Sequence, residues 1–216
     1  YAATMLLLVN SANCQMAGFA LITVGWLLSA TSMGLAEWRV WHIDNASSFP
    51  PGIACVGMWR VCIYHHNSNI SKAKFCHQYT FLDDFLPADI HLSQYLLLAA
   101  TILGLLGRGF LILALRNVYL GIVQKHDINS PFIISGVLNI IASVCITVAV
   151  LHNYSCIRHL RGIAFPPSFR LPFKPDSQEA GSAALVASLG AFLMLLSGIF
   201  SLFYTFPLDS QVHPMS

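Results

Sequence analysis

Gly57-Met58-Trp59-Arg60-Val61-Cys62 places a tryptophan and a cysteine in a polar segment, and a second cysteine, Cys76, follows 14 positions after Cys62. Long apolar runs lie on either side of this segment. A large aromatic ring outside those runs is not explained by burial in a membrane. The stretch is therefore compatible with a reactive site, a metal site or a disulfide-bonded structural module.

The composition of the whole chain is that of an integral membrane protein. Of its 216 residues, 56% are hydrophobic and only 9% are charged, whereas soluble domains carry roughly 25% charged residues. The formal net charge of +2 is too small to indicate a nucleic-acid partner. We therefore expect membrane lipid around most of the surface and no binding to nucleic acid.

Four apolar runs are each long enough to cross a bilayer, which takes about 20 residues. They cover about 14–35, 92–115, 131–151 and 180–206. The one charged residue within them is Arg108, and we expect its guanidinium to extend to the closer layer of headgroups. The chain is thus predicted to be a single domain, 1–216, of four transmembrane helices with both termini on the same side.

Sequons and cysteines indicate which segments face outward. N-glycosylation sequons begin at Asn45, Asn69 and Asn153, all within the loops 36–91 and 152–179. The same loops hold Cys55, Cys62, Cys76 and Cys156, and disulfides form in oxidising compartments. A count of basic residues alone would weakly favour the opposite orientation. Giving the sequons and cysteines more weight, we expect two extracellular loops and cytoplasmic termini in a plasma-membrane protein.

The loop 36–91 has the sequence pattern of a small β-sheet. Apolar and polar residues alternate over 37–42, and short β-favouring runs follow over 53–56, 61–64 and 76–81, separated by turn residues. Three or four short strands are predicted. Cys62 and Cys76 fall on separate strands.

Three explanations of the cysteines remain open from the residues alone. A disulfide between Cys62 and Cys76 would stabilise a loop too short to bury much core. A zinc site has suitable ligand types, but its spacing fits no common zinc finger. Its candidate ligands would be Cys62, His65, His66, Cys76 and His77. A thiol or histidine active site lacks any accompanying catalytic motif, so no enzyme activity, cofactor or metal is expected.

Two further cysteines have no clear assignment from the sequence. Cys55 is expected either to remain a thiol or to form a bond with Cys156 in the second loop.

Motifs along most of the chain resemble those of the claudin family. Trp38-Arg39 is similar to the start of the first claudin loop. Gly57-Met58-Trp59, with Cys62 and Cys76, resembles the W–GLW–C–C signature, with Met in place of Leu. Leu-Pro-Ala-Asp at 86–89 and Glu-Ala-Gly-Ser-Ala-Ala-Leu at 179–185 resemble the entries to the second and fourth claudin helices. Gln94 stands where many claudins have arginine.

The resemblance implies both a fold and a function. The implied fold is an all-α membrane protein, a left-handed four-helix bundle with a small extracellular antiparallel sheet from both loops and a Cys62–Cys76 disulfide. The implied function is a structural component of tight junctions, which polymerises with itself and other claudins in cis and in trans and forms or modulates the paracellular barrier or pore. The alternative is an auxiliary or adhesion protein of the myelin-protein or channel-subunit type, which modulates a membrane partner.

The resemblance also suggests roles for individual residues. The residue after the second cysteine helps to set charge selectivity in claudins, and here it is His77. Because an unperturbed imidazole titrates at about 6.5, we expect weak selectivity near neutral pH and a shift towards anions on acidification. Aromatic residues of the second claudin loop contact neighbouring molecules, which makes Phe165 and Phe169 candidates. The terminal Ser216 supplies no apolar anchor for a PDZ groove, so scaffold binding is not expected.

Overall fold

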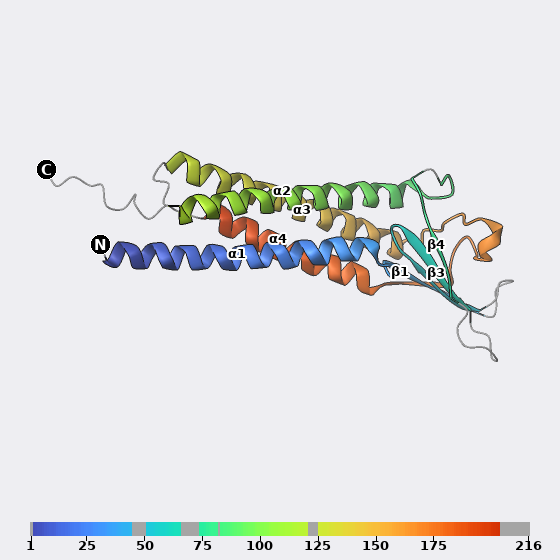
Figure 1. Cartoon of the computed structure of the whole chain (residues 1–216). Helices are drawn as coiled ribbons and strands as arrows, with labels where there is room; N and C mark the ends of the chain where they lie inside the picture. The colour runs from blue at the N-terminus through green and yellow to red at the C-terminus, as the bar shows by residue number, and fades with distance from the viewer. Residues whose placement is uncertain (1, 45–50, 66–73, 82, 121–124, 204–216) are drawn as a thin grey trace. The chain divides into compact units, whose positions relative to one another are not determined.

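The computed structural model describes residues 2–44, 51–65, 74–81, 83–120 and 125–203, which form long helices and short strands in the order traced in Figure 1. The α-helices are α1 (Ala2–Gly34), α2 (Ala88–Tyr119), α3 (Lys125–Arg158) and α4 (Ser182–Leu202). The strands are β1 (Arg39–Ile43), β2 (Gly52–Val56), β3 (Arg60–His65), β4 (Lys74–Gln78) and β5 (Ser177–Ala180), and a single 3-10 turn, η1, covers Pro167–Phe169.

The four α-helices are long and apolar enough to cross a membrane, which confirms the four-helix prediction. A helix suits this environment because it satisfies its backbone hydrogen bonds internally. Three helices extend beyond the predicted apolar runs: α1 begins at Ala2, α2 covers Ala88–Tyr119, and α3 covers Lys125–Arg158. The first part of the predicted second loop, 152–158, is therefore helical. Apolar runs mark the hydrocarbon-spanning part of a helix and do not mark its ends.

The chain forms two compact units, and each α-helix contributes residues to both. The first, here called the helix unit, comprises Tyr1–Leu27, Ala100–Val144 and Gly190–Ser216. The second, called the sheet unit, comprises Leu28–Ala99 and Cys145–Leu189 and contains every described strand.

The helix unit is held together by an apolar cluster and by polar contacts between helices. Ile22, Leu111 and Phe132 are almost completely buried in that cluster. The Ser143 hydroxyl donates to the carbonyl oxygen of Ala191 at 2.7 Å. Hydroxyls bonded to backbone carbonyls are satisfied without water, as an apolar environment requires.

Arg108 packs against an aromatic ring within the helix unit. Its guanidinium carbon lies 4.7 Å from the centre of the Trp26 ring, a geometry in which the cation is attracted to the face of the indole. The ring is itself fixed, because Trp26 Nε1 donates to the carbonyl oxygen of Thr101 at 2.9 Å. The charge in the second apolar run therefore has a specific protein partner; its approach to the headgroups stays a prediction.

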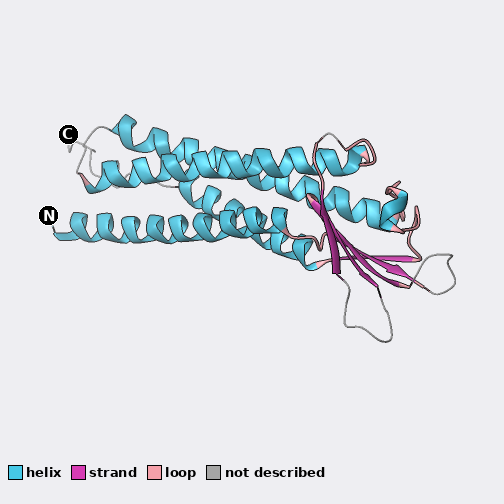
Figure 2. Cartoon of the chain, turned by 45° about the vertical axis from the view of Figure 1, so that its right-hand side comes forward, coloured by secondary structure: helices cyan, strands magenta, loops and turns pink. Residues whose placement is uncertain are grey.

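The strands, magenta in Figure 2, form one antiparallel sheet. Their order is β4-β3-β2-β1-β5. Strand β1 pairs with β2 on one side, and on the other with β5, which comes from the second loop. Arg39, Trp41 and Ile43 on β1 are buried, and the residues between them are partly exposed, the alternation of a half-buried strand. The structure thus confirms a small antiparallel sheet built from both loops.

Candidate functional site

The predicted disulfide is present in the sheet unit. Cys62 on β3 and Cys76 on β4 are paired in the strand register, and their sulfurs are bonded at 2.07 Å. Because each sulfur is bonded to the other, neither is available to a metal, and the alternative zinc site that included both is excluded. Cys156 is a free, buried thiol, so the alternative of a Cys55–Cys156 bond is wrong.

Trp38 and Gly57 fix the sheet to the end of α1. The indole Nε1 of buried Trp38 donates to the carbonyl oxygen of Ser32 at 2.8 Å. Gly57 approaches the backbone so closely that a Cβ there would lie 2.6 Å from the carbonyl oxygen of Leu35 and 2.7 Å from Cα of Ala36. Only glycine permits this approach, which is a physical reason for the glycine of the Gly57-Met58-Trp59 motif.

Met58 and Trp59 connect the same turn to α2 and its preceding loop. Met58 is buried, and its carbonyl oxygen accepts a hydrogen bond of 2.6 Å from Nε2 of Gln94 on α2. The half-buried ring of Trp59 lies edge-on to Phe81, with centroids 4.8 Å apart. Trp59 is therefore a packing residue, and Gln94 has a structural role.

Arg39 is buried at the centre of the sheet unit. Only 1% of its surface is exposed, and its Nε donates to Oδ1 of Asn153 on α3 at 2.7 Å. Asn153 in turn donates from Nδ2 to the carbonyl oxygen of Trp38 at 3.2 Å. Desolvation by burial lowers the pKa of Arg39 from its ordinary value, and nearby Cys156 and Asp89 partly offset that effect.

The burial of Asn153 rules out one predicted glycosylation site. The residue has no exposed surface, and its amide is engaged by Arg39 and by the backbone of Trp38. A glycan on that nitrogen is incompatible with this fold, so the prediction for Asn153 is wrong. The other two sequon residues, Asn45 and Asn69, lie outside the described residues.

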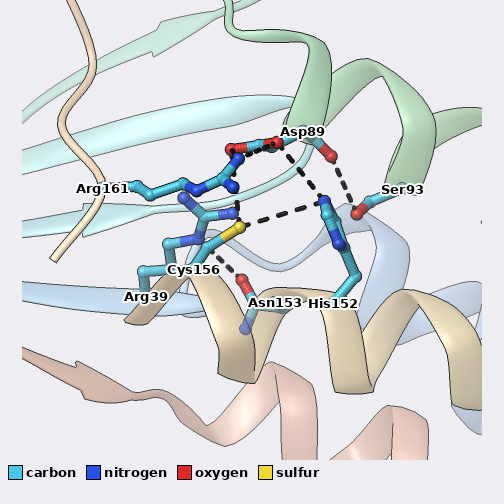
Figure 3. Close-up of polar contacts among 7 residues, drawn as sticks. All are labelled: Arg39, Asp89, Ser93, His152, Asn153, Cys156 and Arg161. Carbon is cyan, nitrogen blue, oxygen red and sulfur yellow. Dashed lines mark hydrogen bonds and ion pairs between the residues drawn. The ribbon is translucent and has the colours of Figure 1, made fainter. Parts of the chain in front are cut away.

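A polar cluster beside Arg39 joins the beginning of α2 to the end of α3 (Figure 3). Nη1 of Arg161 donates to both carboxylate oxygens of Asp89, at 2.8 and 2.9 Å. His152 Nε2 lies 3.4 Å from Asp89 Oδ1. The Cys156 thiol donates to Asp89 Oδ2 at 3.5 Å and lies 3.9 Å from His152 Nε2. The Asp89 carboxylate is thus contacted by a guanidinium, an imidazole and a thiol.

This cluster was not predicted from the sequence. Its signal was the spacing of His152 and Cys156, four residues apart, which places both on one face of a helix. The predicted end of the third helix at about 151 placed both residues in a loop. In a loop, a spacing of four residues does not indicate a shared face.

The second loop folds its aromatic residues against the sheet unit. Phe169 is 6% exposed, and its ring centre lies 5.1 Å from that of His77 and 5.6 Å from that of Phe165. The half-buried Phe165 also lies edge-on to Trp41 at 5.6 Å. Burial inside its own chain removes Phe169 as a contact residue for neighbours, which corrects that prediction. Phe173, which is 59% exposed, was not considered from the sequence.

Comparison with known proteins agrees with this architecture. A sequence model of the family described as PMP-22/EMP/MP20/Claudin tight junction matches residues 23–203. The chain belongs to this family. It is also similar to Claudin-3 of the dog, Canis lupus familiaris, with 27% identity over 192 residues, 87% of this chain and 81% of that protein.

Membership of the claudin family agrees with the described structure. The helices, the antiparallel sheet and the disulfide all fit a claudin-like four-helix bundle with a β-sheet. The chain is accordingly a multi-pass membrane protein with a claudin-like, tight-junction type of role.

Proposed function

We propose that this chain is a structural, non-catalytic component of tight junctions, which polymerises within and between cell membranes and forms or modulates the paracellular barrier or pore. The main support is the single sheet that combines strands from both loops and is crosslinked by Cys62–Cys76, in a chain of the claudin family. Its partners are copies of itself, other claudins and membrane lipid. Ser216, on which the expectation about PDZ scaffolds rests, lies outside the described residues.

The decisive experiment is expression in fibroblasts that lack tight junctions. Continuous strands at cell contacts in freeze-fracture images support polymerisation. Diffuse membrane protein without strands contradicts it and favours the second candidate, an auxiliary protein that modulates a partner in the same membrane. The second candidate is retained because the matching family description names PMP-22, EMP and MP20 beside claudin.

The proposed orientation places both loops outside the cell and both termini in the cytoplasm. If it holds, glycosidase treatment should lower the apparent mass of the protein, and substitution of both Asn45 and Asn69 by Gln should remove that shift. Asn153→Gln serves as the matched control, because the buried amide carries no glycan. Protease digestion of a cytoplasmic tag only after permeabilisation supports the orientation, whereas digestion in intact cells contradicts it.

The proposed pore-lining residue is His77 on β4, next to the disulfide. The partly exposed imidazole of His77 packs edge-on to Phe169, and this contact limits the orientations of the imidazole ring. We expect His77→Lys to favour anions and His77→Asp to favour cations in diffusion potentials across cell layers. The same two changes at exposed His159 should have no effect. Wild-type selectivity that does not move towards anions in mildly acidic medium contradicts the assignment.

A further inference from the structure

Three different metal-ligating groups converge in the sheet unit, outside the disulfide and the proposed pore residue. Among the described residues, single ligand atoms of Asp89, His152 and Cys156 lie within 4.8 Å of one another. The nearest contacts are 3.4 Å from His152 Nε2 to Asp89 Oδ1, 3.5 Å from the Cys156 thiol to Asp89 Oδ2 and 3.9 Å from the thiol to His152 Nε2. We propose that Asp89, His152 and Cys156 bind a zinc ion, with water as the fourth ligand.

The spacing of the three atoms suits tetrahedral zinc. Zinc bonds of about 2.0–2.3 Å to oxygen, nitrogen and sulfur place neighbouring ligand atoms about 3.3–3.7 Å apart. The imidazole–carboxylate and thiol–carboxylate contacts fall within that interval, each to a different oxygen of Asp89, and the thiol–imidazole distance of 3.9 Å lies above it. An ion therefore fits between them once the carboxylate turns to present one oxygen to both neighbours, a movement that side-chain torsions provide.

The ligands are held by rigid elements and remain reachable from solvent. His152 and Cys156 are one turn apart on α3, and Asp89 belongs to the first turn of α2. The Ser93 hydroxyl donates to the Asp89 carbonyl oxygen at 3.1 Å and holds that turn. Cys156 is buried, whereas the side chains of His152 and Asp89 are 29% and 15% exposed. The imidazole side is thus the entry path for the ion and its water.

The surrounding charges allow an exchange without a change in local net charge. The cluster now holds the guanidiniums of Arg39 and Arg161 and the carboxylate of Asp89 (Figure 3). When zinc binds, the Cys156 thiol releases its proton to solvent and Arg161 leaves the carboxylate. The formal charges of zinc, the Cys156 thiolate, the Asp89 carboxylate and the Arg39 guanidinium then sum to a single positive charge. The two guanidiniums and the carboxylate have the same sum before zinc binds. Arg39, beside the sulfur, compensates the charge of the metal-bound thiolate.

Arg161 is the competitor that this exchange displaces. Its side chain is 54% exposed, and it bonds both oxygens of the carboxylate that zinc needs. Removal of the Arg161 charge should therefore tighten zinc binding, although it deletes a protein contact. A purely structural ion-pair cluster predicts no metal binding whatever residue stands at 161.

Cobalt provides a direct readout of the ligands in the purified full chain in detergent. Co²⁺ substitutes for zinc, and we expect a thiolate-to-metal charge-transfer band in the near ultraviolet together with tetrahedral d–d bands, all reversed by Zn²⁺. Cys156→Ser should abolish the charge-transfer band. His152→Gln should weaken affinity by about a hundredfold or more, since even loss of a partner outside the coordination sphere costs 10–100-fold. Cys145→Ser, a thiol change on the same helix, is the matched control and should change nothing.

Two results would overturn the zinc site. One is the absence of a charge-transfer band in the wild-type protein, and the other is its persistence in Cys156→Ser. Arg161→Gln gives a test that does not depend on deleting a buried group. It should bind Zn²⁺ roughly tenfold more tightly in calorimetric titration, because a neighbouring positive charge is removed. Unchanged or weaker binding in Arg161→Gln contradicts the proposed competition and with it the site.

Discussion

The guanidinium of Arg39 donates from Nε to Oδ1 of Asn153 at 2.7 Å, and both side chains are withdrawn from solvent. The remaining nitrogens of Arg39, Nη1 and Nη2, have no hydrogen-bond partner among the described residues. The hydrogen bonding of the buried Arg39 guanidinium therefore depends strongly on the neutral side chain of Asn153.

Because of this dependence, removing Asn153 should lower the free energy of unfolding more than removing Arg39. Asn153→Ala leaves a buried charge without its acceptor and should lower the free energy of unfolding by about 3–5 kcal/mol. Arg39→Met removes the desolvation cost together with the bond, so about 1.5–3 kcal/mol is expected. Thermal or denaturant unfolding in detergent measures both, with exposed Arg158→Met as the control. A larger loss for Arg39→Met than for Asn153→Ala would refute the assignment.

The Cys62–Cys76 disulfide should contribute strongly to the sheet unit. It closes a segment with a separation of 14 residues, for which chain-entropy models give about 3 kcal/mol. The double change Cys62→Ser with Cys76→Ser should lower the unfolding free energy by about that amount under oxidising conditions. Cys145→Ser, which touches no disulfide, is the comparison. Equal thermal unfolding of the double variant and wild type would show that the bond has no such role.

Two glycines on α2 should respond oppositely to the same change. A Cβ at Gly107 would lie 2.9 Å from Oδ1 and 3.0 Å from Nδ2 of Asn139, whereas one at Gly109 meets nothing within 4 Å. Gly107→Ala should therefore cost about 1–3 kcal/mol through overpacking. Gly109→Ala should be neutral or should stabilise the helix by up to about 1 kcal/mol. Unfolding of the two variants side by side tests this, and equal effects would contradict the packing of Asn139 on Gly107.

Two aromatic residues of the second loop, Phe169 and Phe173, should differ in how much they contribute to stability. Phe169→Ala should destabilise the chain by about 3–5 kcal/mol, because a buried ring is removed. Phe173→Ala should change the unfolding free energy by less than about 0.5 kcal/mol, because that side chain is largely exposed. A melting temperature lowered equally by both changes would disagree with the structure.

The sequence predicted those features that follow from local periodicity and composition. Apolar runs of membrane length gave the four helices, and period-two alternation around Trp38 and Trp41 gave the first strand. The claudin resemblance supplied the disulfide and the participation of both loops in the sheet. These features depend on patterns that a single sequence contains.

The features that were missed depend on how far elements extend and which way loops turn. The polar end of α3 has no apolar signal, so Asn153, His152 and Cys156 were assigned to a loop. Phe169 lies in a short turn without periodicity, and nothing local distinguishes a ring that folds inward from one that faces a neighbour. The pairing of Arg39 with Asn153 joins residues 114 positions apart, which no local pattern specifies.

The pairing of β1 with β5 limits how these loops can be exchanged between relatives. Arg39 to His42 form a ladder with Ser177 to Ala180, so the edge strand from the second loop takes its register from the first. A chimera that receives a foreign first loop keeps a native β5 but must align it with a different β1. Chimeras between relatives should therefore exchange both loops together, because neither loop alone contains a complete β1–β5 pair.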